Sequence, residues 1–176
     1  MGYTTEFQGA FDLDKPLTKA RREYLFKFSD TRRMNRDAKK TKKRPDSVRK
    51  AAKLPVGDEG AYFVGETGFA GQDYGPDVID GNEPPTGQPG LWCKWEPNKE
   101  GTKIRWNGME KFYDYIDWLE YLINHFLEPW GYKLNGTVTW TGENPTDIGK
   151  IYVRDNVIEA KPGTINFPSP SWGIDD

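Results

Sequence analysis

The sequence predicts one α+β domain over residues 1–161, with a mainly antiparallel sheet of about six to seven short strands and two principal helices. Two segments, 18–34 and 108–128, carry apolar residues at the spacing of a helix that buries one face. Several short runs rich in β-branched and aromatic residues lie between Gly, Pro and Asn, a pattern typical of strands joined by turns. The length of 176 residues fits one domain of ordinary size.

The first elements are a strand and a helix. Residues 4–13 are expected to form a strand, because Phe7 and Phe11 stand among polar neighbours that can face solvent. The helix over 18–34 should begin at Thr18, whose hydroxyl can accept from the first free backbone N–H groups.

Long connections follow the first helix. Residues 35–53 form a basic connector, which we expect to be solvated and mobile up to residue 44 and to carry a short helix over 45–52. A short strand is expected at 61–64. Residues 65–90 contain seven Gly, four Pro and no Lys or Arg. A loop of this length is usually functional or disordered, and its apolar residues favour an ordered acidic loop.

The second half of the chain predicts a hairpin, a helix and three more strands. In the sequence Asn107-Gly108-Met109-Glu110, Asn107 and Glu110 have the spacing of a capping box, so the helix over 108–128 should begin there. Its apolar residues surround it almost completely, which indicates a central position. The strands are expected at 91–96, 102–106, 137–142, 150–154 and 157–161, and residues 162–176 form an extended tail.

Charge is divided unevenly along the chain. Residues 15–53 hold sixteen Lys or Arg against four acids, whereas the rest of the chain is acidic, so the net charge of −2 hides a basic segment within an acidic chain. Segregated charge gives information about partners rather than about fold. The basic segment therefore predicts contact with a polyanion or an acidic protein surface.

A set of residues from the first helix and the connector is the candidate contact surface. On a helical projection Phe26 lies opposite the apolar stripe, on the same outer face as Arg22 and Arg33. The lysines that follow could neutralise several phosphates with strongly salt-dependent affinity. The predicted binding residues are Arg22, Phe26, Arg33, Arg36, Lys39, Lys40, Lys42, Lys43 and Arg44.

Carboxylates supply the main catalytic candidates. Glu120 falls on the predicted buried stripe of the second helix, where a carboxylate must be paired, for instance with Arg21, or must act in a cleft. Asp73 in the long loop could join it as an acid–base pair. Gln72, Trp92 and Trp95 complete the residues expected around a pocket under that loop.

Several kinds of chemistry are excluded or disfavoured. His125 is the only histidine, which excludes chemistry that needs a histidine pair, and we expect it to lie on the surface. Cys93 is the only cysteine, so no intramolecular disulfide can form, and its position in a strand indicates a buried, inert thiol. Asp73, Asp77 and Asp80 do not have the spacing of an EF-hand loop. No metal site or cofactor is therefore expected.

Four motifs of this sequence occur together in a known family. They are Gly2-Tyr3-Thr4-Thr5-Glu6-Phe7, Gly68-Phe69-Ala70-Gly71-Gln72-Asp73, Gly87-Gln88-Pro89-Gly90-Leu91-Trp92-Cys93-Lys94-Trp95, and the segment from Glu110-Lys111-Phe112-Tyr113 into the helix of Trp118. On these motifs the chain resembles an uncharacterised family of small bacterial and phage proteins. The resemblance implies no activity and no site residues.

Three functional hypotheses follow from the sequence. The leading one is a non-catalytic protein whose basic first helix and connector bind a polyanion, such as nucleic acid, or an acidic protein surface. The second is an enzyme on a nucleotide or carbohydrate with a carboxylate-based site under the loop 65–90. The third is a phage inhibitor of a host protein, whose acidic face would imitate DNA phosphates. The single cysteine and the lack of a signal-peptide pattern predict a cytoplasmic protein without membrane contact.

Overall fold

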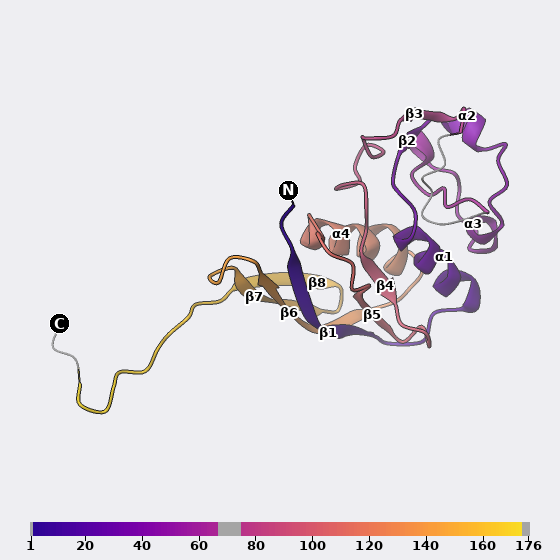
Figure 1. Ribbon diagram of the computed structural model, residues 1–176. Helices are drawn as coiled ribbons and strands as arrows, with labels where there is room; N and C mark the ends of the chain where they lie inside the picture. Colours follow the sequence, from indigo (N-terminus) through magenta and orange to yellow (C-terminus); the bar gives the residue numbers. More distant parts are fainter. Residues whose placement is uncertain (1, 67–74, 174–176) are drawn as a thin grey trace.

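The computed structural model describes residues 2–66 and 75–173 and confirms the α+β fold. A six-stranded antiparallel sheet has the strand order β4-β5-β1-β6-β7-β8, and a separate two-stranded sheet pairs β2 with β3 (Figure 1). The strands of the large sheet are β1 (Thr5–Leu13), β4 (Trp95–Pro97), β5 (Lys103–Trp106), β6 (Leu134–Gly142), β7 (Ile148–Arg154) and β8 (Val157–Pro162). The small sheet contains β2 (Asn35–Arg36) and β3 (Val78–Asp80).

Alternation along β1 explains why the large sheet has one buried and one exposed face. Phe7 and Phe11 are buried, whereas Gln8 and Asp12, which follow each of them, are exposed. The same alternation recurs in β7, because side chains on a strand point to opposite faces in turn. The helices α1 and α4 lie on the buried side of this sheet in Figure 1.

A close approach in the sheet requires a glycine. Trp140 on β6 pairs with Gly149 on β7, and the indole ring of Trp140 lies over that glycine. A Cβ at Gly149 would come within 2.2 Å of the ring. The absence of a side chain there therefore lets Trp140 fold down onto the sheet.

The first helix, α1 (Lys19–Ser29), begins as expected and ends early. The Thr18 hydroxyl accepts from the backbone N–H of Arg21, which confirms the N-cap. At the other end the Ser29 and Thr31 hydroxyls donate to the carbonyls of Phe26 and Lys27. These side-chain bonds satisfy the last turn, so the predicted extension to residue 34 is wrong.

The second long helix begins later than its sequence pattern suggests. It comprises α4 (Tyr115–Leu122) and the π-helical turn η2 (Ile123–Leu127). The predicted capping box is wrong, because the Asn107 side chain accepts from the N–H of Met109 in a tight local turn. Phe112 is buried against the sheet before the helix starts, which keeps residues 107–114 in an irregular loop.

Aromatic rings fill the core, as the composition indicates. Phe7 contacts the rings of Trp95, Phe112 and Tyr115 at centroid distances between 4.9 and 5.7 Å. A second group under α1 joins Tyr24, Phe28 and Phe126. Such offset and edge-to-face pairs add to the free energy gained from burying the rings.

The basic connector and the loop that follows it form a smaller, largely irregular region at one end of the molecule (Figure 1). It contains α2 (Ala38–Thr41), α3 (Ser47–Ala51), the 3-10 turn η1 (Asp58–Gly60) and the small sheet. The short helix expected at 45–52 corresponds to α3, whereas the strand expected at 61–64 is irregular chain. Of the long loop, residues 67–74 lie outside the described part and β3 lies within it.

The C-terminal residues of the described chain are extended. Residues 163–173 leave β8 as an exposed tail (Figure 1). None of the helices formed by residues 2–66 and 75–173 is long and apolar enough to cross a bilayer.

Truncating Phe11 to Ala should lower the free energy of unfolding by about 3–5 kcal/mol, because it leaves a cavity in the aromatic core. The matched control is Tyr152→Ala, which removes an exposed ring from β7 and should change stability by less than about 1 kcal/mol. Urea denaturation measures both variants. Equal effects of the two substitutions would contradict the assignment of the two sheet faces.

Candidate functional site

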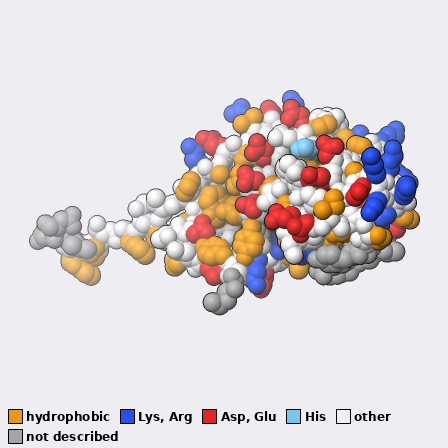
Figure 2. Space-filling model, turned by 90° about the horizontal axis from the view of Figure 1, so that it is seen from above, with side chains coloured by type: hydrophobic (Ala, Val, Ile, Leu, Met, Phe, Trp, Pro, Cys, Tyr) orange, Lys and Arg blue, Asp and Glu red, His pale blue; other side chains and the backbone are white. Residues whose placement is uncertain are grey.

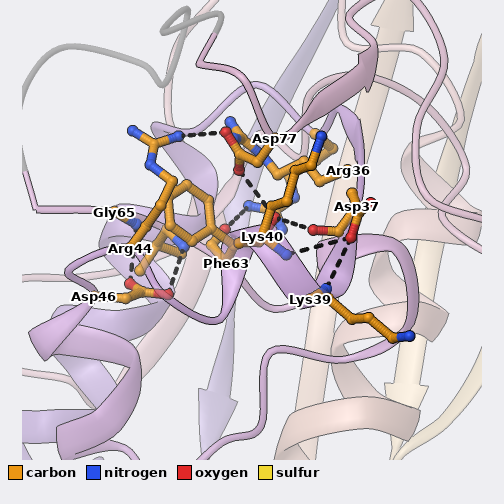
Figure 3. Close-up of polar contacts among 12 residues, drawn as sticks. Arg36, Asp37, Lys39, Lys40, Arg44, Asp46, Phe63, Gly65 and Asp77 are labelled. Atoms are coloured by element: carbon orange, nitrogen blue, oxygen red, sulfur yellow. Dashed lines mark hydrogen bonds and ion pairs between the residues drawn. The ribbon is translucent and has the colours of Figure 1, made fainter.

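The buried carboxylate of Asp77 binds three side chains of the basic connector. Its Oδ2 accepts from Arg36 Nη1 at 2.8 Å and from the Thr41 hydroxyl at 2.9 Å, and its Oδ1 accepts from Arg44 Nη1 at 3.0 Å (Figure 3). Asp77 and Arg36 side chains are each 2% exposed. We refer to Asp77, Arg36, Thr41 and Arg44 as the Asp77 network.

The ring of Phe63 completes the environment of the two arginines. The guanidinium carbons of Arg36 and Arg44 lie 4.4 and 5.0 Å from its centroid (Figure 3). Cation–π contacts of this kind compensate part of the hydration that a buried cation loses. The network therefore balances charge, hydrogen bonds and ring contacts without an aliphatic core.

Electrostatics keep Asp77 ionised. Burial alone would raise the pKa of Asp77, but hydrogen bonds from Arg36 and Thr41 and the charges of Arg36 and Arg44 outweigh it and hold the pKa below its usual value. Ionised Asp77 thus neutralises part of the charge of a segment that would otherwise repel itself.

Asp46 makes a second buried contact. It accepts from Arg49 Nε at 2.6 Å and from the backbone N–H of Gly65 at 2.9 Å. Arg49 also donates to the carbonyl of Leu54. These bonds hold α3 against the start of the long loop.

Arg33 is a buried arginine with neutral acceptors. It donates to the carbonyls of Phe63 and Ala61 and to the Gln88 side chain, and its guanidinium carbon lies 4.2 Å from the Phe28 centroid. Burial lowers the pKa of Arg33 below its usual value. The expectation of an outward-facing Arg33 is therefore wrong, since α1 ends before it and the chain turns inward.

Three of the predicted contact residues, Arg33, Arg36 and Arg44, therefore make hydrogen bonds within the protein. The mobile, solvated connector is also a wrong expectation, because Arg36 and Thr41 are buried and α2 is formed. Sequence patterning misses this because the segment packs through polar side chains rather than apolar ones. Arg44 keeps 27% of its side-chain surface exposed beside Asp77.

The lysines of this region point outward around a groove. Lys39, Lys40, Lys42, Lys43 and Lys50 are exposed, and we refer to them as the lysine surface. Asp37 caps α2 by accepting from the backbone N–H groups of Lys39 and Lys40, and their ammonium groups make no contact among the residues drawn in Figure 3. None of the five ammonium groups has an ion-pair partner within residues 2–66 and 75–173.

A groove of about 840 Å³ lies beside the lysine surface. Lys39 from α2, Lys42 directly after α2 and Lys50 from α3 border it, and the half-buried Tyr62 lines it. One exposed acid, Asp58, is at its rim. Figure 2 shows Lys and Arg gathered at the end of the molecule that carries α2 and α3, with acids across the face in view.

The two other predicted contact residues lie on α1 itself. Arg22 is half-buried against Gly101, on the connection between β4 and β5. Phe26 is also half-buried. The structure therefore brings together the predicted lysines and leaves these two residues outside the groove lining.

Glu120 does not lie on the buried face of α4. It is exposed, and it lines a hollow of about 370 Å³ together with Asp117 and His125. The buried stripe is centred on Trp118 and Leu122 rather than on Ile116, which puts Glu120 outside. Arg21, its expected partner, instead donates to the Tyr132 hydroxyl.

The remaining pocket candidates are separated. Trp95 is buried in the core and donates to the carbonyl of Tyr115, so it lines no pocket that Glu120 shares. Trp92 is half-buried and lines another hollow near Trp118. Gln72 and Asp73 lie outside the described residues.

His125 and Cys93 take the positions expected for non-catalytic residues. His125 is exposed, stacks on Tyr121 at a centroid distance of 3.9 Å and has Nδ1 3.0 Å from the Tyr62 hydroxyl. Partial burial lowers the pKa of His125. Cys93 is fully buried, and burial raises the pKa of its thiol to about 12, which disfavours a nucleophilic thiolate.

The acids of the long loop do not form a metal site in the described part of the chain. The Asp77 carboxylate accepts hydrogen bonds from Arg36 and Arg44, and Asp80 is exposed. Among residues 2–66 and 75–173 no group of three or more His, Cys, Asp or Glu is arranged to hold a metal ion.

Comparison with known proteins gives no relative. No family model matches this chain, and neither curated protein sequences nor solved structures give a match. The resemblance to small bacterial and phage proteins stays a prediction.

Two features of this site were missed from the sequence. Lys50 belongs to the lysine surface but was not singled out, although its position in the short helix after Pro45 was a usable signal. The role of Asp77 had no local signal, because its partners lie 33 to 41 residues away.

Replacing Asp77 with Asn should destabilise the protein by about 3 kcal/mol, because the buried Arg36 would lose its charged hydrogen bond to this carboxylate. Since the folded pKa of Asp77 is lowered, its contribution is complete above about pH 4 and is lost as the pH falls further. The variant should therefore lack that part of the acid-induced loss of stability. Denaturation over roughly pH 3 to 7 measures both effects.

The control is Glu83→Gln, which removes an exposed acid from the same loop and should leave stability within about 0.5 kcal/mol. If Asp77→Asn behaved like this control, Asp77 would not neutralise the basic connector.

Proposed function

We propose that this protein acts by binding a polyanion, with nucleic acid as the preferred class, through the lysine surface and its groove. The observation that carries the proposal is a cluster of exposed lysines whose ammonium groups have no acidic partner among the described residues. Unpaired like charges held on one surface attract an anion, and they release counterions from it on binding.

The buried arginines support the proposal, because they stabilise the fold and leave the lysines available for binding. Arg33, Arg36 and Arg49 are at most 5% exposed and serve the fold. The lysines next to them keep their charge in solvent. Lysine is a flexible point charge suited to phosphate contacts that do not need a fixed geometry.

The ring of Tyr62 favours nucleic acid over an acidic protein surface. It lines the groove between residues of the lysine surface. An aromatic face beside basic side chains is the arrangement that binds single strands, with the base stacked and the backbone neutralised. The groove thus offers both components of a sequence-tolerant contact.

The enzyme and inhibitor hypotheses stay predictions. Glu120, Asp117 and His125 share a hollow, and the acidic side chains in Figure 2 are compatible with a second partner on that face. Polyanion binding has the support of a cluster of exposed lysines without an ion-pair partner in the described part of the chain, so we take it as the leading function.

Binding can be measured by fluorescence anisotropy with labelled single-stranded RNA, a DNA duplex and heparin over roughly 50 to 200 mM salt. The triple variant Lys39→Gln, Lys42→Gln, Lys50→Gln should bind more weakly. The slope of log affinity against log salt should fall by about 1 for each lysine that contacts a phosphate.

The matched control is Lys99→Gln, Lys133→Gln, Lys150→Gln, which removes the same charge from exposed lysines elsewhere. It should retain most of the affinity. No binding to any of the three probes at about 50 mM salt, or equal losses in both triple variants, would contradict the proposal.

A further inference from the structure

A separate hollow of about 410 Å³ lies where two of the sequence motifs meet. Gly90, Leu91 and Trp92 come from the motif over residues 87–95. Tyr113 and Trp118 come from the segment that begins at Glu110. Neither motif contributes to the lysine surface. The hollow shares no lining residue with the groove beside the lysine surface.

The backbone on one side of this hollow is strained. Lys111 and Asp114 have φ values of 61° and 55°, in the left-handed region that non-glycine residues rarely occupy. Asp114 is also the N-cap residue of α4, yet its side chain makes no capping hydrogen bond. Such strain is typical of functional sites, where the geometry rather than local stability determines the conformation.

Lys94 holds this loop in place from the opposite side. Its ammonium group donates to the backbone carbonyls of Glu110 and Lys111. Burial lowers the pKa of Lys94, and the nearby charge of Lys111 adds to this effect. The hollow is thus built by specific contacts and is not a gap between mobile loops.

The indole N–H of Trp118 is the unexplained polar group in this hollow. Trp118 is fully buried, and its Nε1 has no hydrogen-bond partner among the described residues. An unsatisfied buried donor costs about 1–3 kcal/mol. A ligand atom that accepts from this N–H would recover that free energy.

Gly90 borders the space next to this N–H. A Cβ at Gly90 would be 3.8 Å from Trp118 Nε1 and 3.7 Å from Asp114 Oδ2. The donor and the carboxylate therefore border the same space above the glycine. Asp114 is exposed, so its side chain can turn to admit a ligand.

The chemistry of this space selects a hydroxyl group. One hydroxyl oxygen can accept from an indole N–H while its hydrogen donates to a carboxylate. Glu110 and Asp114 are balanced by Lys94 and Lys111 in the lining, so the hollow has no excess of charge and favours a neutral ligand. The rings of Trp92 and Tyr113 supply apolar surface beside these polar groups, as ligand sites commonly do.

We propose that this hollow binds a neutral saccharide unit. One hydroxyl accepts from Trp118 Nε1 and donates to Asp114, and the C–H faces of the sugar pack on Trp92 and Tyr113. This site goes beyond polyanion binding, because it uses a different surface and an uncharged ligand. No bond is made or broken in it.

The test is titration of the intact protein with a panel of neutral saccharides, at up to roughly 20 mM to detect weak binding. The panel includes methyl glucoside, methyl galactoside, N-acetylglucosamine and their β1,4-linked dimers. The readout is the indole N–H resonance of Trp118 in a ¹⁵N-labelled sample, assigned with Trp118→Phe. We expect a saturable shift of this resonance for at least one saccharide.

Gly90→Ala is the decisive variant. The backbone at Gly90 is not in the left-handed region, and the added methyl would make ordinary contacts with Trp118 and Asp114. The fold should therefore persist while the methyl reduces the space left for the hydroxyl, and affinity should fall at least about tenfold. Gly163→Ala, near the far end of the sheet, is the matched control and should bind like the parent protein.

A second variant tests the carboxylate without disturbing the backbone. Asn tolerates the left-handed region, so Asp114→Asn should fold normally and bind more weakly because the charged acceptor is gone. No shift with any saccharide, or a shift that Gly90→Ala leaves unchanged, would overturn the proposal. An N–H that exchanges with water alone, without a saccharide effect, would identify the site as a hydration site and also overturn it.

Discussion

The carboxylate of Asp77 is the interaction on which the basic end of the molecule depends. It accepts hydrogen bonds from Arg36, Thr41 and Arg44, which come from a segment with almost no apolar side chains. A segment of this composition cannot fold by burying hydrocarbon, and by itself it would repel its own charges. One buried acid from a distant loop changes this balance, because it offsets part of the charge of the two arginines and accepts hydrogen bonds from both.

The consequence for function is a separation of roles between arginine and lysine. Arginines, with planar groups that form several fixed hydrogen bonds, are used inside. Lysines, which are strongly hydrated, remain outside on α2 and α3. A folded scaffold holds these charges in a constant arrangement, so less conformational entropy is lost when a partner binds. The large aromatic core and its sheet form the platform that positions this scaffold.

The sequence predicts the parts of the fold that follow apolar periodicity. Phe7 and Phe11 locate β1 within one residue of its observed start, and Thr18 locates the start of α1. The pattern fails where polar groups decide the structure. Hydroxyls of Ser29 and Thr31 end α1, the Asn107 side chain forms a turn instead of a cap, and Asp77 orders the connector. Four of the five lysines of the candidate site, all except Lys50, could be predicted, because an exposed charge needs no partner. The burial of Arg33 and Arg36 could not, because their partners are distant in sequence.

Hydrogen exchange of the backbone amides of residues 33–37 tests the central claim most directly. The N–H of Asp37 donates to the carbonyl of Asp77, that of Asn35 to Glu83 and that of Arg33 to Leu91, each at 2.8 Å. If the Asp77 network folds this segment, these amides exchange far more slowly than those of an unfolded chain, and Asp77→Asn removes much of the protection. Exchange at the rate of an unstructured peptide in the unmodified protein would contradict the account, since the basic segment would then be the mobile connector that its composition suggests.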